Sequence, residues 1–441
     1  SVAKLLQKLL GLGILRVRLA GVNFIKGLLG RYGTPPWLNE QTEYLLPSSW
    51  IGSASTGTSA FQSRMIANMF DEYANAWKSG EILMPTCSGV FEVDLSRLQE
   101  LQARPASICL LGPSFYVGEF PLVAELGGFP GFAQSARRAG LVVSEFDTSQ
   151  ILAINGYGGR RVTSAQEVNQ ELRRLRDHLR ETKPEILVID GNFVPGAGSY
   201  DAQLLGDLQR EFGFSLCTVI ADFHELQTED KLGYWGEISD LVVFTAGSWN
   251  HHNKYYDQFS HKEKVLLSPC PPTDESQWMQ KIVPKDIQLG FWGGKGRRRT
   301  DYLDFATKCE IATTIMYRED VGRKSFDEYV EFLLRSKISF TSGFTGIAGG
   351  RRTGIMTYRI WESILSKALL IHESGSQIDE FLVPFIHFVP VDSVHELVHY
   401  SRFLLDNEKI AENISAAALA FYREHYSSTK FWNCVRDMIH R

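Results

Sequence analysis

The strongest constraint on the fold is an alternation of short apolar runs with amphipathic helical segments that begins near Ser107. The runs are apolar throughout, whereas a strand with one solvated face alternates apolar and polar residues. Continuous apolar runs are typical of parallel strands that helices cover on both faces. We therefore expect an α/β protein. At roughly 150 residues per domain, its 441 residues correspond to two to three domains.

The first series of elements predicts a parallel sheet. Ser107–Gly112 and Leu141–Phe146 read as strands on either side of a helix that Gly140 ends, which is a β-α-β unit. Ser164 and Glu167 form a capping box in front of the next amphipathic helix. The further strand candidates are Glu185–Asp190, Ser215–Ala221, Asp240–Thr245 and Lys264–Leu267.

A second series follows a proline-rich stretch at Ser268–Thr273. A helix is expected at Tyr358–Ser366, and Ser393 with Glu396 forms a capping box that opens the helical carboxyl end. The strand candidates here are Ile287–Trp292, Ile311–Tyr317, Lys337–Thr341 and Ala368–His372. Two such series predict two Rossmann-like, doubly wound domains that face each other across a cleft, with ligands at the carboxyl ends of the strands.

This organisation gives the expected domain boundaries. They are an amino-terminal extension at 1–94, a first Rossmann-like domain at 95–268, a linker at 269–286, a second Rossmann-like domain at 287–425, and a carboxyl-terminal helix at 426–441 that packs back on the first domain.

The amino-terminal segment differs in charge from the rest of the chain. Six basic residues and no acidic residue lie between Ser1 and Asn39, although the whole chain has a net charge of −5. Leucines at helical spacing beside Lys4 and Lys8 suggest that residues 1–31 bind an anionic membrane surface. The alternative is a helix packed on its own domain. The overall charge gives no indication of nucleic-acid binding.

Cysteine spacing and hydropathy point to a reduced compartment. The six cysteines lie far apart and no apolar run reaches about 18 residues. We therefore expect a cytoplasmic protein that lies peripherally on the inner face of the membrane.

Two glycine-rich basic loops are candidate anion sites. The first, Gly293–Arg299, follows a strand and precedes a helix, so its amide groups, Lys295 and Arg299 could hold a phosphate beside Gly294. It matches neither the P-loop nor the G-x-G-x-x-G pattern, and a solvated basic turn is the alternative. The second loop, Ser342–Thr353, contains Arg352 and has the same character.

The helix after the second loop suggests a family. Arg359 and Glu362 lie on one face of it, and the stretch Tyr358–Glu373 resembles the nucleotide-sugar-binding half of a GT-B glycosyltransferase. The resemblance is to the group 1 and spore-maturation-like branch, with its motif R-x-x-E-A-x-x-x-G. It implies that Glu362 binds the ribose hydroxyls and that Arg359 or the glycine-rich loops bind the diphosphate. It further implies that Glu373, Ser374 and Gly375 face the donor sugar.

The resemblance extends into the first half of the chain. Gly127–Val143 is similar to the glycine-rich loop and first helix of the acceptor domain in this family, which assigns Gly128 and Gly131 to the acceptor side. Two positions depart from the family. Gly354 stands where retaining members usually have a glutamate, and Lys367 replaces the turn glycine before the buried strand. Whether the enzyme is retaining or inverting is therefore left open.

The site is expected to work without a metal or another cofactor. No D-x-D pair occurs in the chain, so arginine, lysine and helix dipoles have to neutralise the leaving diphosphate. Asp222 and His224 follow a predicted strand and are candidates for the base that deprotonates the acceptor hydroxyl, with Asp190 placed similarly. For each of them a structural role is the alternative.

These observations favour a glycosyltransferase that moves a sugar from a nucleotide sugar to a glycan, lipid-linked or protein acceptor. Two other functions remain open at this point. One is a catalytically inert sugar-nucleotide-binding assembly subunit, and the other is an enzyme like the nucleotide-sugar 2-epimerases.

Overall fold

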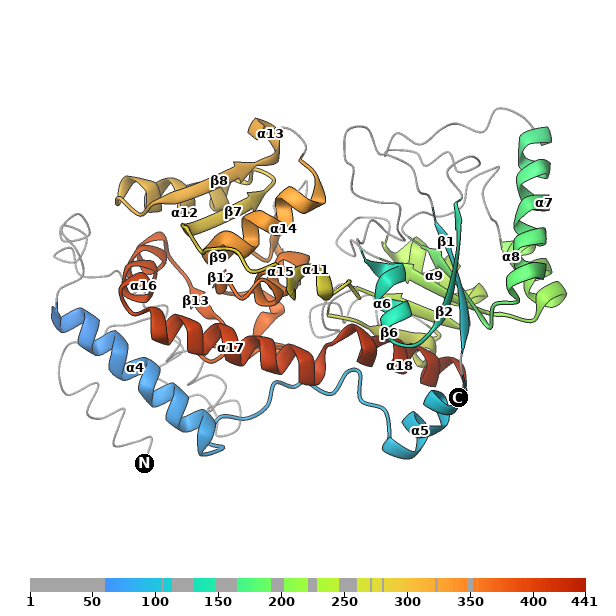
Figure 1. Ribbon diagram of the computed structural model, residues 1–441, viewed down its shortest axis with the longest axis horizontal. Helices are drawn as coiled ribbons and strands as arrows, with labels where there is room; N and C mark the ends of the chain where they lie inside the picture. The colour runs from blue at the N-terminus through green and yellow to red at the C-terminus, as the bar shows by residue number, and fades with distance from the viewer. Residues whose placement is uncertain are drawn as a thin grey trace.

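The computed structural model describes residues 60–104, 106–112, 131–147, 165–191, 202–220, 228–245, 260–269, 272–279, 281–321, 324–346, 352–354 and 356–441. Within these residues the chain forms two parallel sheets, each with helices on both faces, in two domains that lie side by side (Figure 1).

The first domain is built on a six-stranded sheet with the order β2-β1-β3-β4-β5-β6. All of its strand pairs are parallel. The strands are β1 (Ser107–Gly112), β2 (Val142–Asp147), β3 (Ile186–Asp190), β4 (Ser215–Ile220), β5 (Leu241–Phe244) and β6 (Val265–Leu267).

Successive strand residues of the first sheet pack into two different cores, because side chains in a strand point alternately to the two faces. Cys109 and Leu111 contact one core, which includes residues of α7 (Ala165–Thr182), α8 (Ala202–Phe212) and α9 (Thr228–Ile238). Ile108 and Leu110 contact the other core, formed with α6 (Phe132–Arg138) and α18 (Ser428–Ile439).

The second domain has a five-stranded parallel sheet with the order β13-β12-β9-β7-β8. The strands are β7 (Ile287–Gly293), β8 (Thr313–Tyr317), β9 (Ser336–Thr341), β12 (Leu369–Glu373) and β13 (Val389–Val391). Because β8 and β9 lie on opposite sides of β7, the strand order reverses between β7 and β9. In doubly wound sheets this reversal marks the edge where ligands bind.

Helices cover both faces of the second sheet. Residues of α12 (Arg297–Lys308) and α16 (Val394–Asp406) share one core with the strands. Residues of α14 (Phe326–Arg335), α15 (Tyr358–Leu365) and α17 (Glu408–His425) contribute to the other. A short antiparallel hairpin of β10 (Phe344–Gly346) and β11 (Arg352–Gly354) lies between β9 and α15 in the chain.

The sequence-based expectation of the fold class is confirmed. Each predicted strand is present, and most boundaries agree within one residue; β8 begins two residues later than expected. The Ser393 cap is also present, since Ser393 Oγ accepts the amide of Glu396 at 3.2 Å. In a complete capping box the Glu396 carboxylate would accept the amide of Ser393. Here it accepts the amide of the preceding residue, Asp392, at 2.6 Å. Ser164 lies outside the described residues.

Among the residues that the structure describes, three segments join the two domains. The linker between β6 and β7 contains the short helix α11 (Ser276–Met279), and Trp361 of α15 donates its Nε1–H to Pro269 O at 3.0 Å. The return crossing runs from α17 to α18, which lie end to end below the two sheets in Figure 1. Thr273 and Ser428 tie these two crossings together, because the Thr273 amide and the Thr273 carbonyl both bond to Ser428 Oγ, at 3.0 and 2.9 Å.

The third connection is the described part of the expected amino-terminal extension. Helix α4 (Ala60–Lys78) packs on the second domain, where the ring of Phe70 stacks on Phe403 with centroids 5.8 Å apart. The chain then crosses to α5 (Leu95–Ala103) beside α18, and Arg97 of α5 pairs with Asp437 at 3.2 Å (Figure 1). Residues 1–59, including the predicted membrane-binding segment, lie outside the described residues.

The chain leaves α15 through a left-handed residue, as the family motif requires. Lys367 has φ of +56°, the Ala368 amide bonds to Ser363 O at 3.0 Å, and the Lys367 amide bonds to Ile364 O at 3.0 Å. These two bonds are a Schellman motif, which usually has glycine at the left-handed position. Lys367 therefore adopts the strained conformation that its position in the motif implied.

Candidate functional site

Two arginines of the predicted donor site lie close together at the carboxyl edge of the second sheet. Arg299 belongs to α12 and Arg359 to α15, yet their guanidinium carbons lie 5.4 and 5.6 Å from the centroid of the Phe291 ring in β7. Burial, together with repulsion from Arg359, lowers the pKa of Arg299 to about 10. Arg299 therefore stays protonated at neutral pH, and the edge holds two neighbouring guanidinium groups.

Glycine at position 293 makes room for one of these charges. A Cβ atom on Gly293 would lie 2.7 Å from Arg359 Cζ, closer than such atoms approach each other. Arg299 Nη1 also donates to Gly294 O at 2.7 Å, and the buried Arg299 Nε has no acceptor among the described residues. The strand end thus brings the two guanidinium groups together and leaves a buried donor for an anion.

Glu362 lies on the same helix face as Arg359 and is held by a residue of a neighbouring helix. The hydroxyl of Tyr329 in α14 donates to Glu362 Oε2, and the positive charge of Arg359 acts on Tyr329 as well. Burial raises the pKa of Glu362 to about 6, although the Tyr329 bond and the charge of Arg359 lower it. Tyr329 and Glu362 are thus joined by a hydrogen bond, and the charge of Arg359 acts on both.

The end of β12 places Glu373 at the same edge. Its side chain is fully buried, and Ser342 Oγ donates to Glu373 Oε2 at 2.6 Å. Its negative charge acts on Arg299 and favours the protonated guanidinium. Ser374 and Gly375 follow in the next turn, where the Ser374 amide bonds to Val391 O at 2.8 Å and Gly375 has φ of +88°.

Lys295 is oriented differently from the two arginines. Its ammonium group lies 2.5 Å from Asp320 Oδ1, and its amide nitrogen lies 3.1 and 3.0 Å from the two carboxylate oxygens of Glu319. Both acidic residues belong to α13 (Arg318–Val321), which follows β8. The first glycine-rich loop therefore already binds a carboxylate.

The predicted acceptor-side residues are described only in part. Gly131 is the N-cap of α6 with φ of +84°, and a Cβ atom there would lie 2.3 Å from the Asp274 amide nitrogen of the linker. Gly131 thus makes a close backbone contact with the linker. The remaining predicted positions, Gly128, Asp222 and His224, lie outside the described residues, as do the side chains of Asp190 and Arg352.

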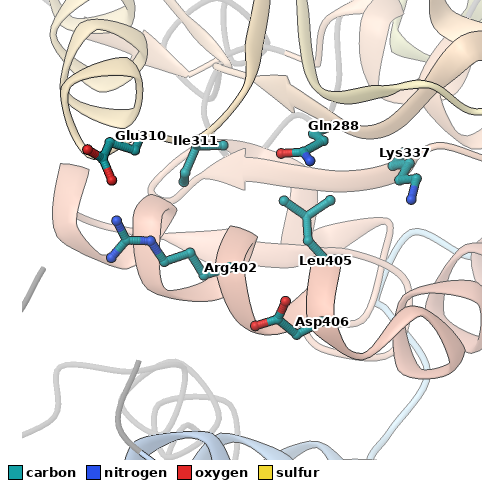
Figure 2. Close-up of a pocket in the computed structure, with 7 residues that line it drawn as sticks. All are labelled: Gln288, Glu310, Ile311, Lys337, Arg402, Leu405 and Asp406. Atoms are coloured by element: carbon teal, nitrogen blue, oxygen red, sulfur yellow. The ribbon is translucent and has the colours of Figure 1, made fainter. Parts of the chain in front are cut away.

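A hollow of about 250 Å³ lies at the opposite edge of the second sheet (Figure 2). It is lined by side chains near the amino ends of β7, β8 and β9 and by residues of α16, namely Gln288, Glu310, Ile311, Lys337, Arg402, Leu405 and Asp406. Neither Arg299 nor Glu362 lines it. The hollow therefore does not coincide with the predicted site, which depends on the charges at the carboxyl edge.

The described residues contain neither a cluster of metal ligands nor a membrane-spanning helix. No three histidine, cysteine, aspartate or glutamate side chains within them gather closely enough to hold a metal ion. No helix of the described part is both long and apolar enough to cross a membrane.

Sequence reasoning missed Tyr329. Its contact with Glu362 spans 33 positions in the chain, so no local pattern indicates it. One local signal was present: Ser325 and Glu328 form a capping box that opens α14, and this box fixes where the helix that holds Tyr329 begins.

Comparison with known proteins bears on the second domain. Residues 278–433 match the model of the family described as "Glycosyl transferase-like". No curated protein matches the chain. This family match confirms the predicted resemblance to GT-B glycosyltransferases, while the spore-maturation branch stays a prediction.

Several solved structures are similar to this chain at low sequence identity. HepE from Anabaena in complex with UDP-glucose has a TM-score of 0.48 and 12% identity, and the match covers 75% of this chain and 98% of HepE. Sucrose-phosphate synthase from Thermosynechococcus elongatus has a TM-score of 0.45 and 10% identity, over 75% and 97% of the two chains. A glycosyltransferase from Rickettsia africae has a TM-score of 0.44 and 10% identity, over 76% and 98%.

Proposed function

We propose that this chain transfers a sugar from a nucleoside-diphosphate sugar to a glycan, lipid-linked or protein acceptor without a metal ion. The match of residues 278–433 to the family described as "Glycosyl transferase-like" supports the transferase activity. The observation that supports this proposal most directly is the pair of guanidinium groups, Arg299 and Arg359, within 6 Å of one phenylalanine ring. Two such charges repel each other, and an anion between them relieves that repulsion.

The roles of the side chains follow from their charge. Arg299 and Arg359 bind the diphosphate, whose negative charge grows as the bond to the sugar breaks, and this lowers the barrier to transfer. Glu362, on the same face of α15, accepts hydrogen bonds from the ribose hydroxyls. Glu373 and the turn at Ser374 and Gly375 lie at the end of β12, where they face the donor sugar.

The same residues support a metal-independent mechanism. Cationic side chains and helix amides supply the charge that a divalent ion supplies in other transferases. The base that deprotonates the acceptor remains a proposal, with Asp222 and His224 as the candidates.

A donor screen tests the proposal. The full chain is heated with a panel of nucleoside-diphosphate sugars in the presence of a chelator, and a ligand at 100 times its Kd stabilises the fold by about 2.7 kcal/mol. We expect one base to raise the unfolding temperature, and Glu362→Ala to remove this shift. Stabilisation only in the presence of a divalent metal would contradict metal independence.

Product analysis with the selected donor then tests the chemistry. Release of the nucleoside diphosphate with sugar bound to an acceptor, or to water, supports a transferase. Binding without turnover on any acceptor supports the inert subunit, and an epimerised donor supports the epimerase.

We also propose that residues 1–31 bind the protein to the inner face of the membrane, on the strength of their positive charge. Sedimentation with vesicles that contain anionic lipid tests this, with neutral vesicles and a variant lacking residues 1–31 as controls. Equal sedimentation of the two proteins would contradict it.

A further inference from the structure

Tyr329 is the residue through which α14 reaches the proposed donor site. Its hydroxyl donates to Glu362 Oε2, and the positive charge of Arg359 acts on the same hydroxyl. Tyr329 therefore links the two residues of the family motif, although it lies outside that motif.

Aromatic side chains fix the Tyr329 ring in place. Its centroid lies 5.4 Å from that of Trp292 in β7 and 6.1 Å from that of Phe326 in its own helix. Trp278 of the linker helix α11 packs edge-on at 6.3 Å. Because neighbours from three elements limit the ring, the hydroxyl has one defined position.

The Glu362 carboxylate depends on this hydroxyl. Burial disfavours its charged form, and the two interactions that favour the charged form come from Tyr329 and Arg359. Tyr329 of α14 and Arg359 of α15 are the titratable or charged neighbours that act on Glu362. Arg299 of α12 lies close enough to Arg359 for their charges to repel each other.

We propose that Tyr329 is a positioning residue that orients the Glu362 carboxylate toward the sugar hydroxyls of the bound nucleotide and keeps it ionised. This inference rests on the proposed function. Without the tyrosine hydroxyl, the carboxylate can rotate toward Arg359 or take up a proton, and in either form it accepts hydrogen bonds from a ribose less well.

The test uses Tyr329→Phe, which keeps the ring and removes only the hydroxyl. The matched control is Tyr400→Phe, because Tyr400 has a buried hydroxyl in α16 and packs in the core on the other face of the sheet. Binding of the nucleoside-diphosphate sugar selected by the donor screen is measured by calorimetry between about pH 5 and about pH 8. The nucleotide sugar is used in place of the free nucleoside diphosphate because its diphosphate has no group that titrates in this pH range.

We expect the wild type and Tyr400→Phe to lose affinity together as the pH falls through about 6, where Glu362 is protonated. Tyr329→Phe should bind about tenfold more weakly at neutral pH, the size of one lost hydrogen bond to a charged group. Its pH midpoint should also move upward by about one unit, since the bond that favours the carboxylate is gone.

The outcomes separate this inference from the proposed function. A Tyr329→Phe protein that binds like the wild type, or that binds more weakly by the same factor at every pH, would overturn the positioning role. Absence of binding by the wild type to any nucleotide sugar would instead contradict the proposed function itself.

Discussion

The raised pKa of Glu362 predicts that Glu362→Gln stabilises the protein while it weakens nucleotide binding. The pKa rises from the ordinary value of 4.5 to about 6 on folding, so the folded chain favours the neutral carboxyl group. The stability that Glu362 contributes is fully present below about pH 4.5 and is lost as the pH rises through about 6. A pKa shift of this size lowers the free energy of unfolding by about 0.8 kcal/mol at pH 5 and by about 2 kcal/mol at pH 8. Both values are upper estimates, because Glu362 is only half-buried.

Glutamine has nearly the shape of the protonated glutamate and no charge to desolvate. The free energy of unfolding of Glu362→Gln should therefore exceed that of the wild type by up to about 2 kcal/mol at pH 8, and the gain should shrink toward pH 5. Urea unfolding followed by tryptophan fluorescence at both pH values measures this difference. A variant that is less stable than the wild type at pH 8, or a gain independent of pH, would refute the assignment of the charge penalty to Glu362.

Three further predictions follow from the second domain. Lys367→Gly should raise the free energy of unfolding by about 1 kcal/mol, because Lys367 has φ of +56°, and Lys367→Ala should bring no comparable gain in the same unfolding assay. Gly293→Ala should weaken donor binding about tenfold in calorimetry, because the added Cβ displaces the Arg359 guanidinium, and an unchanged Kd would contradict the proposed role of that group. Glu319→Gln should raise the affinity for the donor several-fold at low salt, because the Glu319 carboxylate occupies the amide of Lys295; a fall in affinity would show that it supports the loop instead.

The fold could be predicted from the sequence wherever the strands are uniformly apolar. Leu187, Val188 and Ile189 are buried in β3, and such runs have few alternatives. β13 was missed because it has three residues, one of which is Pro390, and proline is rare inside strands. Neither its length nor its composition distinguishes it from a loop.

The candidate site could be predicted where its residues lie close together in the sequence. Arg359 and Glu362 are one turn apart on α15, Arg299 lies in the first turn of the helix that follows β7, and Glu373 is the last residue of β12. Tyr329 and the acidic partners of Lys295 could not be predicted, because they depend on how loops after different strands pack together. A sequence shows that Lys295 follows a strand, but it does not show that α13 turns two carboxylates toward it.

The three connections between the domains have a practical consequence for protein engineering. A fragment limited to the matched residues 278–433 would end inside α18 and remove Trp432 from its contact with Ser135, a hydrogen bond of 2.9 Å. It would also lack α4 and so uncover Phe385 and Phe403, which are almost fully buried in the whole chain. We expect such a fragment to aggregate on expression, so the second domain is best studied within a polypeptide that begins before Ala60 and keeps its carboxyl end.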